Sequence, residues 1–308
     1  MKQEAITLGQ NTPYPLKGIL TLPDGDGPFP GLVLVHGSGA SNMDEKVGKL
    51  TPFRDLAQGL AQRGIASVRY DKRSFAHGLK MAGDKSGPIT VWEETIEDAL
   101  LAAALLRSDP RIDSRRVFLL GHSMGAMLAP RIDCQGGDFR GLILLAGSPR
   151  RLEEILLEQT AEAAASMSGP AGWIMGKQLG KLRSTFAGLY DLSDEEAKRK
   201  KTGGGTTLYY FKEMGQPPVA HWLAKTAKPM LILHGEKDFQ VKARIDFELY
   251  RQLLGDRENV SFKLYPGLNH AFVTARFDSI TQAKKEFTPE RHIGPEVLDD
   301  IANWIAQQ

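Results

Sequence analysis

The chain has 308 residues, of which 42% are hydrophobic and 25% are charged, as expected for a globular protein with a substantial core. Its formal net charge of +2 gives no electrostatic reason to expect a nucleic acid or an acidic partner. The single cysteine, Cys134, excludes an internal disulfide, and we interpret it as a half-buried thiol without a catalytic role.

The start of the chain carries no sign of a secretion signal, because residues 1–7 contain no apolar core segment. No stretch approaches the roughly 18 consecutive apolar residues that a membrane-spanning helix needs. We therefore expect a cytoplasmic protein with no membrane span. A homo-oligomer is compatible with the sequence.

Short apolar runs alternate with helical periodicities through the first half of the chain. An amphipathic helix is predicted over 51–62, and the capping box Thr90-x-x-Glu93 opens a second, longer helix. This alternation is typical of an α/β protein whose sheet is mostly parallel and flanked by helices. Strands are predicted at 3–9, 16–22, 31–35, 64–70, 117–120 and 142–145, the first two as an antiparallel ribbon.

The alternation stops after Gly147 and resumes near residue 229. Between them lie helical pieces interrupted by glycine, proline and aspartate, with many aromatic side chains. We interpret residues 150–224 as an inserted helical cap, and residues 1–149 together with 225–308 as one α/β domain. In the last part of the chain we predict strands at 229–233 and 260–264, a helix near 242–254 and a terminal helix from Pro295.

The strand at 117–120 leads into Gly121-His122-Ser123-Met124-Gly125, a Gly-x-Ser-x-Gly motif. Between a parallel strand and a helix, this motif forms a sharp turn that presents the serine at the edge of the sheet. Gly121 and Gly125 are needed because side chains there would collide with the neighbouring strand and helix. A serine hydroxyl becomes an effective nucleophile when a histidine takes its proton and N–H groups receive the oxyanion. Ser123 is therefore the predicted nucleophile.

His270 is the predicted general base, because it follows the last strand, where a loop can place its imidazole beside Ser123. The acid that orients this imidazole should lie between Ser123 and His270 in the chain and leave the end of a strand. The segment after the strand at 229–233 supplies two candidates. Asp238 is the better candidate, and Glu236 is the alternative.

The predicted oxyanion hole consists of two backbone N–H groups, from Met124 after the nucleophile and from Ser38 in the glycine-rich loop after the strand at 31–35. We interpret His36 and His234, each at the end of a buried strand, as histidines that brace loops. No group of histidine, cysteine and acidic residues has the spacing of a zinc site, and we expect neither a metal nor a cofactor.

These residues together make the chain resemble the α/β-hydrolase superfamily over essentially its whole length. Within it, several runs resemble bacterial carboxylesterases related to dienelactone hydrolases and cinnamoyl esterases. Two departures, Ala40 where a proline is common and Ser74 where a glycine is common, are expected to reshape the pocket mouth. The runs are His36-Gly37-Ser38-Gly39 with Asp44-Glu45, Pro52 to Ala57, Arg69 to Arg73, Gly121 to Gly125, Gly267 to His270 and Ile293 to Val297.

The resemblance implies an α/β-hydrolase fold and a cofactor-free serine carboxylesterase, which hydrolyses short-chain or aryl esters through an acyl-enzyme on Ser123. A small-molecule ester is the expected partner. An aminopeptidase or amidase is the first alternative, with Glu153, Glu154, Glu158 and Glu162 as amine-binding candidates or simply a solvated helix face.

An acyl-CoA thioesterase is the second alternative, with the basic run 198–201 as a phosphate-binding patch, although a solvated helix end explains that run better. A non-catalytic ligand-binding protein of the same fold is the remote alternative. Acidic and basic residues at 44–45 and 71–73 lie near the catalytic edge, where we predict a structural ion-pair network.

Overall fold

The computed structural model describes residues 1–83 and 89–308, and within them the centre is an eight-stranded sheet. The strand order is β1-β2-β4-β3-β5-β6-β7-β8. β2 is antiparallel to both β1 and β4, and all other neighbours are parallel, which confirms the predicted ribbon and parallel sheet. The strands are β1 (Lys2–Leu8), β2 (Leu16–Leu22), β3 (Phe29–Val35), β4 (Ala66–Tyr70), β5 (Ile112–His122), β6 (Leu142–Leu145), β7 (Met230–Gly235) and β8 (Val260–Tyr265).

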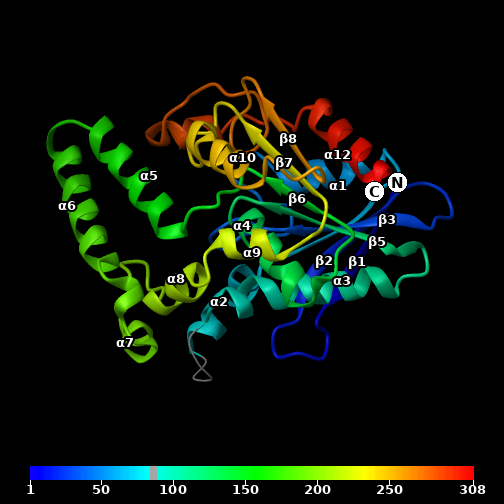
Figure 1. The fold of residues 1–308 in the computed structure, drawn as a ribbon, viewed down its shortest axis with the longest axis horizontal. Helices are drawn as coiled ribbons and strands as arrows, with labels where there is room; N and C mark the ends of the chain where they lie inside the picture. The colour runs from blue at the N-terminus through cyan, green and yellow to red at the C-terminus, as the bar shows by residue number, and fades with distance from the viewer. Residues whose placement is uncertain (84–88) are drawn as a thin grey trace.

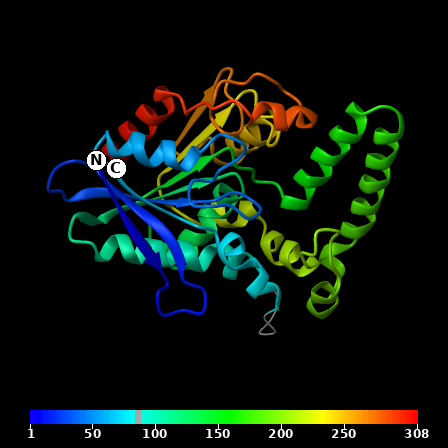
Figure 2. The same cartoon turned by 180° about the vertical axis from the view of Figure 1, so that it is seen from behind.

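Helices cover both faces of this sheet (Figure 1). One face packs against α1 (Pro52–Ala61) and α12 (Pro295–Gln307). The other packs against α3 (Glu97–Ser108), α4 (Met124–Ile132) and α10 (Glu248–Leu254). The chain termini lie side by side at one end of the molecule (Figures 1 and 2).

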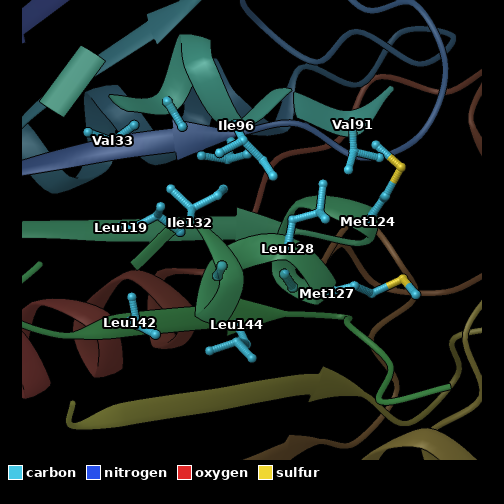
Figure 3. Close-up of a cluster of buried hydrophobic side chains, with 14 of the residues drawn as sticks. Val33, Val91, Ile96, Leu119, Met124, Met127, Leu128, Ile132, Leu142 and Leu144 are labelled. Carbon is cyan, nitrogen blue, oxygen red and sulfur yellow. The ribbon is translucent and has the colours of Figure 1, made fainter. Parts of the chain in front are cut away.

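The central strands are apolar on both sides because each side meets a layer of helices. In β3, Leu32 and Leu34 belong to the core under α1 and α12, whereas Val33 and Val35 belong to the opposite core. Figure 3 shows this second core, where Val33 and Leu119 of the sheet lie near Ile132 of α4. The nucleophile helix α4 is thereby fixed on the middle of the sheet.

Residues 150–224, here called the helical insertion, lie between β6 and β7. Among its described residues the only β pairing is an isolated bridge between Lys201 and Thr207. In both views α5 and α6 extend away from the sheet, whereas α8 lies close to it (Figures 1 and 2). The helices of this region are α5 (Leu152–Ser166), α6 (Gly169–Phe186), η3 (Leu189–Asp191), α7 (Asp194–Arg199), α8 (Leu208–Gly215) and α9 (Val219–Lys225).

Some short elements were not predicted. The helix α2 (Arg73–Gly83) follows β4, and it contains Gly78 and a non-helical backbone at His77, so its sequence carries little helical signal. The capping box at Thr90 begins η1 (Trp92–Ile96), which continues directly into α3. The helix predicted near 242–254 is present as η4 (Ala243–Phe247) followed directly by α10. The remaining short elements are η2 (Asp133–Gly137), η5 (Ile280–Gln282) and α11 (Ala283–Glu286). No helix within residues 1–83 and 89–308 has the length and apolarity that crossing a membrane requires.

Candidate active site

Ser123 occupies the tight turn between β5 and α4, with φ 54° and ψ −117°. This left-handed conformation is strained for a residue with a side chain, and it is what a nucleophile turn requires. Gly121 and Gly125 leave no room for a side chain. A Cβ on Gly121 would lie 2.3 Å from the carbonyl carbon of Gly125, and one on Gly125 would lie 2.2 Å from the oxygen of Val35.

The structure brings His270 and Asp238 into contact near this turn. Asp238 Oδ2 lies 2.6 Å from His270 Nδ1, while Asp238 Oδ1 accepts the N–H groups of Gln240 and Val241 at 2.8 and 2.9 Å. Burial alone would raise the pKa of Asp238, but the charge of His270 and hydrogen bonds from His270 and His234 hold it far below its ordinary value. Because this carboxylate only accepts, His270 Nδ1 donates to it, and in the neutral ring Nε2 is left free to accept a proton.

The alternative acid, Glu236, is exposed, and its Oε2 accepts the N–H of Gly267 at 3.4 Å. Of the two candidates, Asp238 is the one that contacts His270 in the described structure. The two other strand-end histidines brace loops, as predicted: His36 Nε2 lies 3.1 Å from the oxygen of Asn42, and His234 Nε2 lies 2.7 Å from that of Val241.

Ser123 and His270 line one cavity of about 230 Å³, together with Ser38. The loop that carries Ser38 touches the nucleophile turn, since a Cβ on Gly37 would lie 3.1 Å from Ser123 Cβ. Met124 is the first residue of α4, where a backbone N–H has no acceptor within the helix. Both predicted oxyanion donors thus belong to segments that adjoin the serine.

A buried pair, Glu45 and His122, joins the two sides of this site and was not predicted. His122 Nε2 donates to the carbonyl oxygen of His270 at 2.9 Å, and its Nδ1 lies 2.9 Å from Glu45 Oε2. Glu45 Oε1 in turn accepts the N–H of Gly37 at 2.7 Å. Burial lowers the pKa of His122, but the charge of Glu45 outweighs it and the pKa is raised. Both ring nitrogens lie close to oxygen acceptors, an arrangement that favours the protonated ring.

The His270 loop is held by a second unpredicted residue, Glu286, whose side chain is fully buried. Glu286 Oε1 accepts from Asn269 Nδ2 at 2.6 Å and from Arg291 Nη1 at 3.0 Å. Asn269 Oδ1 then accepts the N–H of Ala271 at 3.0 Å, so the loop is tied on both sides of His270. No local sequence pattern marks Glu286, because its partners come from different turns of an irregular segment.

The predicted ion-pair network near the catalytic edge is confirmed, with partners from neighbouring elements. Asp44 pairs with Arg69 at 3.0 Å, and Arg73 pairs with Asp98 of α3. Lys72 pairs with Glu94 of η1 at 3.6 Å. In the part of the chain that the structure describes, no group of three or more histidine, cysteine or acidic residues could hold a metal ion.

The glutamates of α5 are not a simple solvated face. Glu153 is buried and accepts the hydroxyl of Tyr190 at 2.6 Å, and Glu158 accepts from Lys242 at 2.9 Å. Of the two alternatives left open for these glutamates, the solvated face does not describe Glu153, which is buried, and Glu158 is partly covered by its bond to Lys242. The basic run at 198–201 does end a largely exposed helix, α7, and Lys198 pairs with Glu195 at 2.8 Å.

A sequence model of the Alpha/beta hydrolase family matches residues 32–279. The chain belongs to the α/β-hydrolase family. This α/β-hydrolase is 34% identical over 294 residues to the protein "Esterase EstD" of Thermotoga maritima. The match covers 95% of this chain, and the chain spans 66% of the length of that relative.

Solved structures share the fold of this α/β-hydrolase. Est1E from Butyrivibrio proteoclasticus superposes with a TM-score of 0.60 at 14% identity, covering 99% of both chains. The esterase domain of a Rhodothermus marinus protein gives a TM-score of 0.56 at 14% identity, covering 100% of this chain and 99% of that one. At these identities the likeness is one of fold.

Proposed function

We propose that this α/β-hydrolase is a serine carboxylesterase in which Ser123, His270 and Asp238 form the catalytic triad. The observation that carries the proposal is the 2.6 Å bond between Asp238 and His270, placed beside a serine in the strained turn of a nucleophile. The 34% identity to a protein named an esterase supports ester hydrolysis over the other reactions of this fold.

Each side chain then has a defined step. His270 Nε2 takes the proton of Ser123 as Oγ attacks the ester carbonyl carbon. The carbonyl oxygen becomes an oxyanion that accepts the N–H groups of Ser38 and Met124. When the tetrahedral intermediate collapses, the alcohol leaves with the proton from His270. Water, activated by the same histidine, then hydrolyses the acyl-enzyme and restores the serine.

The size of the site supports the proposed substrate class. A cavity of about 230 Å³ is smaller than the pockets of roughly 300–1,000 Å³ that hold drug-sized ligands, so it suits a short acyl or compact aryl group. We further propose that the helical insertion, residues 150–224, acts as a cap on the α/β domain of residues 1–149 and 225–308. Its helix α8 reaches the nucleophile helix, since the hydroxyl of Tyr210 lies 3.5 Å from the sulfur of Met124.

The aminopeptidase and thioesterase alternatives gain no support from the insertion. Glu153 and Glu158 are already bonded to Tyr190 and Lys242, which leaves them poorly placed to bind a substrate amine. The basic run at 198–201 ends an exposed helix, and no contact joins it to the cavity among the described residues.

A hydrolysis panel on the purified protein tests the proposal, with Ser123→Ala as the matched control. The panel contains p-nitrophenyl esters from acetyl to dodecanoyl, a feruloyl ester, an acyl-CoA and an aminoacyl anilide. We expect turnover of short-chain or aryl esters that falls by about 10⁶-fold in Ser123→Ala. Turnover of the anilide alone would indicate an aminopeptidase or amidase, and turnover of the acyl-CoA alone would indicate a thioesterase. A protein that turns over nothing and resists a fluorophosphonate would be a binding protein.

A further inference from the structure

Lys72 is a buried lysine whose ammonium group is bonded to the backbone of the predicted oxyanion loop. Its side chain is 2% exposed, and Nζ donates to the carbonyl oxygen of Gly37 at 2.9 Å. The carbonyl of Gly37 and the N–H of Ser38 belong to one peptide unit. In a planar trans peptide these two groups point in opposite directions, so whatever fixes the carbonyl also fixes the N–H.

The topology brings Lys72 to this peptide. Gly37 follows β3 and Lys72 follows β4, and these two strands are parallel neighbours whose ends meet at the same edge. The backbone N–H of Lys72 also donates to the oxygen of Ser41 at 3.0 Å, so Lys72 holds the loop at two points. On the other side, Glu45 accepts the N–H of Gly37 at 2.7 Å. The Gly37–Ser38 peptide therefore has little freedom to rotate.

A buried ammonium is costly unless it is paired and hydrogen-bonded. Lys72 Nζ lies 3.6 Å from Glu94 Oε1, and Glu94 Oε2 accepts the hydroxyl of Tyr210 from the helical insertion at 2.6 Å. Burial lowers the pKa of Lys72 below its ordinary value, and the charges of Glu94, Glu45 and Asp98 offset part of that shift. Several buried groups are thus arranged around the ammonium group, which donates to the Gly37 carbonyl.

We propose that Lys72 is a positioning residue of the oxyanion hole, which orients and polarises the Gly37–Ser38 peptide so that the Ser38 N–H donates to the developing oxyanion. A cation bonded to the carbonyl withdraws electron density from the amide and makes its N–H a stronger donor, because bonds in a chain polarise one another. The hydrogen bond from this N–H strengthens most as the substrate oxygen gains negative charge. Lys72 therefore stabilises the transition state more than the bound substrate. The inference rests on the proposed function of Ser123.

Lys72→Met removes the donor and keeps the length of the side chain, and Lys72→Arg restores a cationic donor. Because losing a whole oxyanion donor costs about 10²–10³ in kcat, we expect misorientation in Lys72→Met to lower kcat by about 10–100-fold. KM for p-nitrophenyl acetate should change by less than about threefold, since ground-state binding is untouched. The rate of Ser123 labelling by a fluorophosphonate, whose phosphoryl oxygen occupies the same hole, should fall by the same factor as kcat. Lys72→Arg should recover most of both losses.

Arg73→Met is the control, because Arg73 is the next buried cation in the chain and pairs with Asp98 instead of the loop. Both variants are assayed at temperatures where circular dichroism shows them folded, and Arg73→Met should label at the rate of the native protein. Wild-type labelling in Lys72→Met, or an equal loss in Arg73→Met, would overturn the proposal. If Lys72→Met does not fold, Lys72→Gln takes its place in the experiment. If Lys72→Gln is then labelled as fast as Lys72→Arg, the proposal is overturned.

The labelling rate also separates this inference from the proposed function. A native protein that is labelled but hydrolyses none of the esters would refute the esterase proposal, while the labelling rates of the Lys72 variants would still decide the role of Lys72. A native protein that is not labelled at all would refute both.

Discussion

At the scale of single residues, the choice between Asp238 and Glu236 is the sharpest test of the site. Both follow β7, but only Asp238 is buried and bonded to His270. We expect Asp238→Asn to lower kcat by about 10⁴-fold, because the amide stabilises the wrong tautomer of the histidine. Glu236→Gln, two residues away and exposed, should leave kcat within about twofold of the native value. Steady-state kinetics on p-nitrophenyl acetate measure both. A large loss in Glu236→Gln with a small one in Asp238→Asn would reverse the assignment.

His36 makes the stability of the fold depend on pH. Burial lowers its pKa from 6.5 to about 4, so between these values the unfolded chain binds a proton that the folded chain does not. The free energy of unfolding should therefore fall as the pH falls through this window, by up to about 3 kcal/mol from this group. Above pH 6.5 the contribution is constant.

Urea unfolding at neutral pH and near the lower end of this window measures the effect. His36→Gln keeps a donor for the carbonyl of Asn42 and should show a smaller loss of stability on acidification than the native protein. His221→Gln, at an exposed position, is the matched control and should behave like the native protein. Equal losses in all three proteins would contradict the prediction.

At the scale of secondary structure, the elements with strong local signals were predicted correctly. The apolar runs became β3, β5, β6 and β7, and the box at Thr90 does cap its helix, since Glu93 Oε2 accepts from Thr90 N at 2.8 Å. The element without such a signal, α2, was missed. Its glycine and the kink at His77 weaken the pattern, and it is positioned by the end of β4 rather than by its own sequence.

The residues of the site also fall into those that a local sequence pattern marks and those that none marks. The positions of Ser123, Asp238 and His270 at neighbouring strand ends could be predicted, because each follows a recognisable strand and parallel strands end at the same edge of the sheet. The residues that hold them could not. Glu45 meets His122, and Glu286 meets Asn269, only through the packing of irregular loops, for which no spacing rule exists. Buried polar contacts of this kind form only when distant segments pack together, so no local sequence pattern marks them.

At the scale of the whole molecule, the helical insertion packs into the core near both of its chain ends, while its middle helix α6 is largely exposed. Leu208 and Phe211 of α8 belong to the same buried core as the sheet and α4. In α6, by contrast, Phe186 alone among the described side chains is buried, and Trp173 and Ile174 are 63% and 51% exposed. The pictures agree, because α6 lies farther from the sheet than α8 in both views (Figures 1 and 2).

This gradient of burial predicts a gradient of local stability within one chain. Backbone amides of α6 should exchange with deuterium through local openings, because few buried contacts hold that helix. Amides of β5, whose residues from Val117 to His122 are buried between the helical layers, should exchange only through global unfolding, at roughly 5–15 kcal/mol. Hydrogen exchange read by mass spectrometry on peptides of α6, α8 and β5 compares them directly. The helix α8 serves as the internal control, since it belongs to the same insertion but packs into the core, and it should be protected far longer than α6. Equal protection of α6 and β5 would contradict the prediction, and it would mean that the exposed side of α6 is covered in solution.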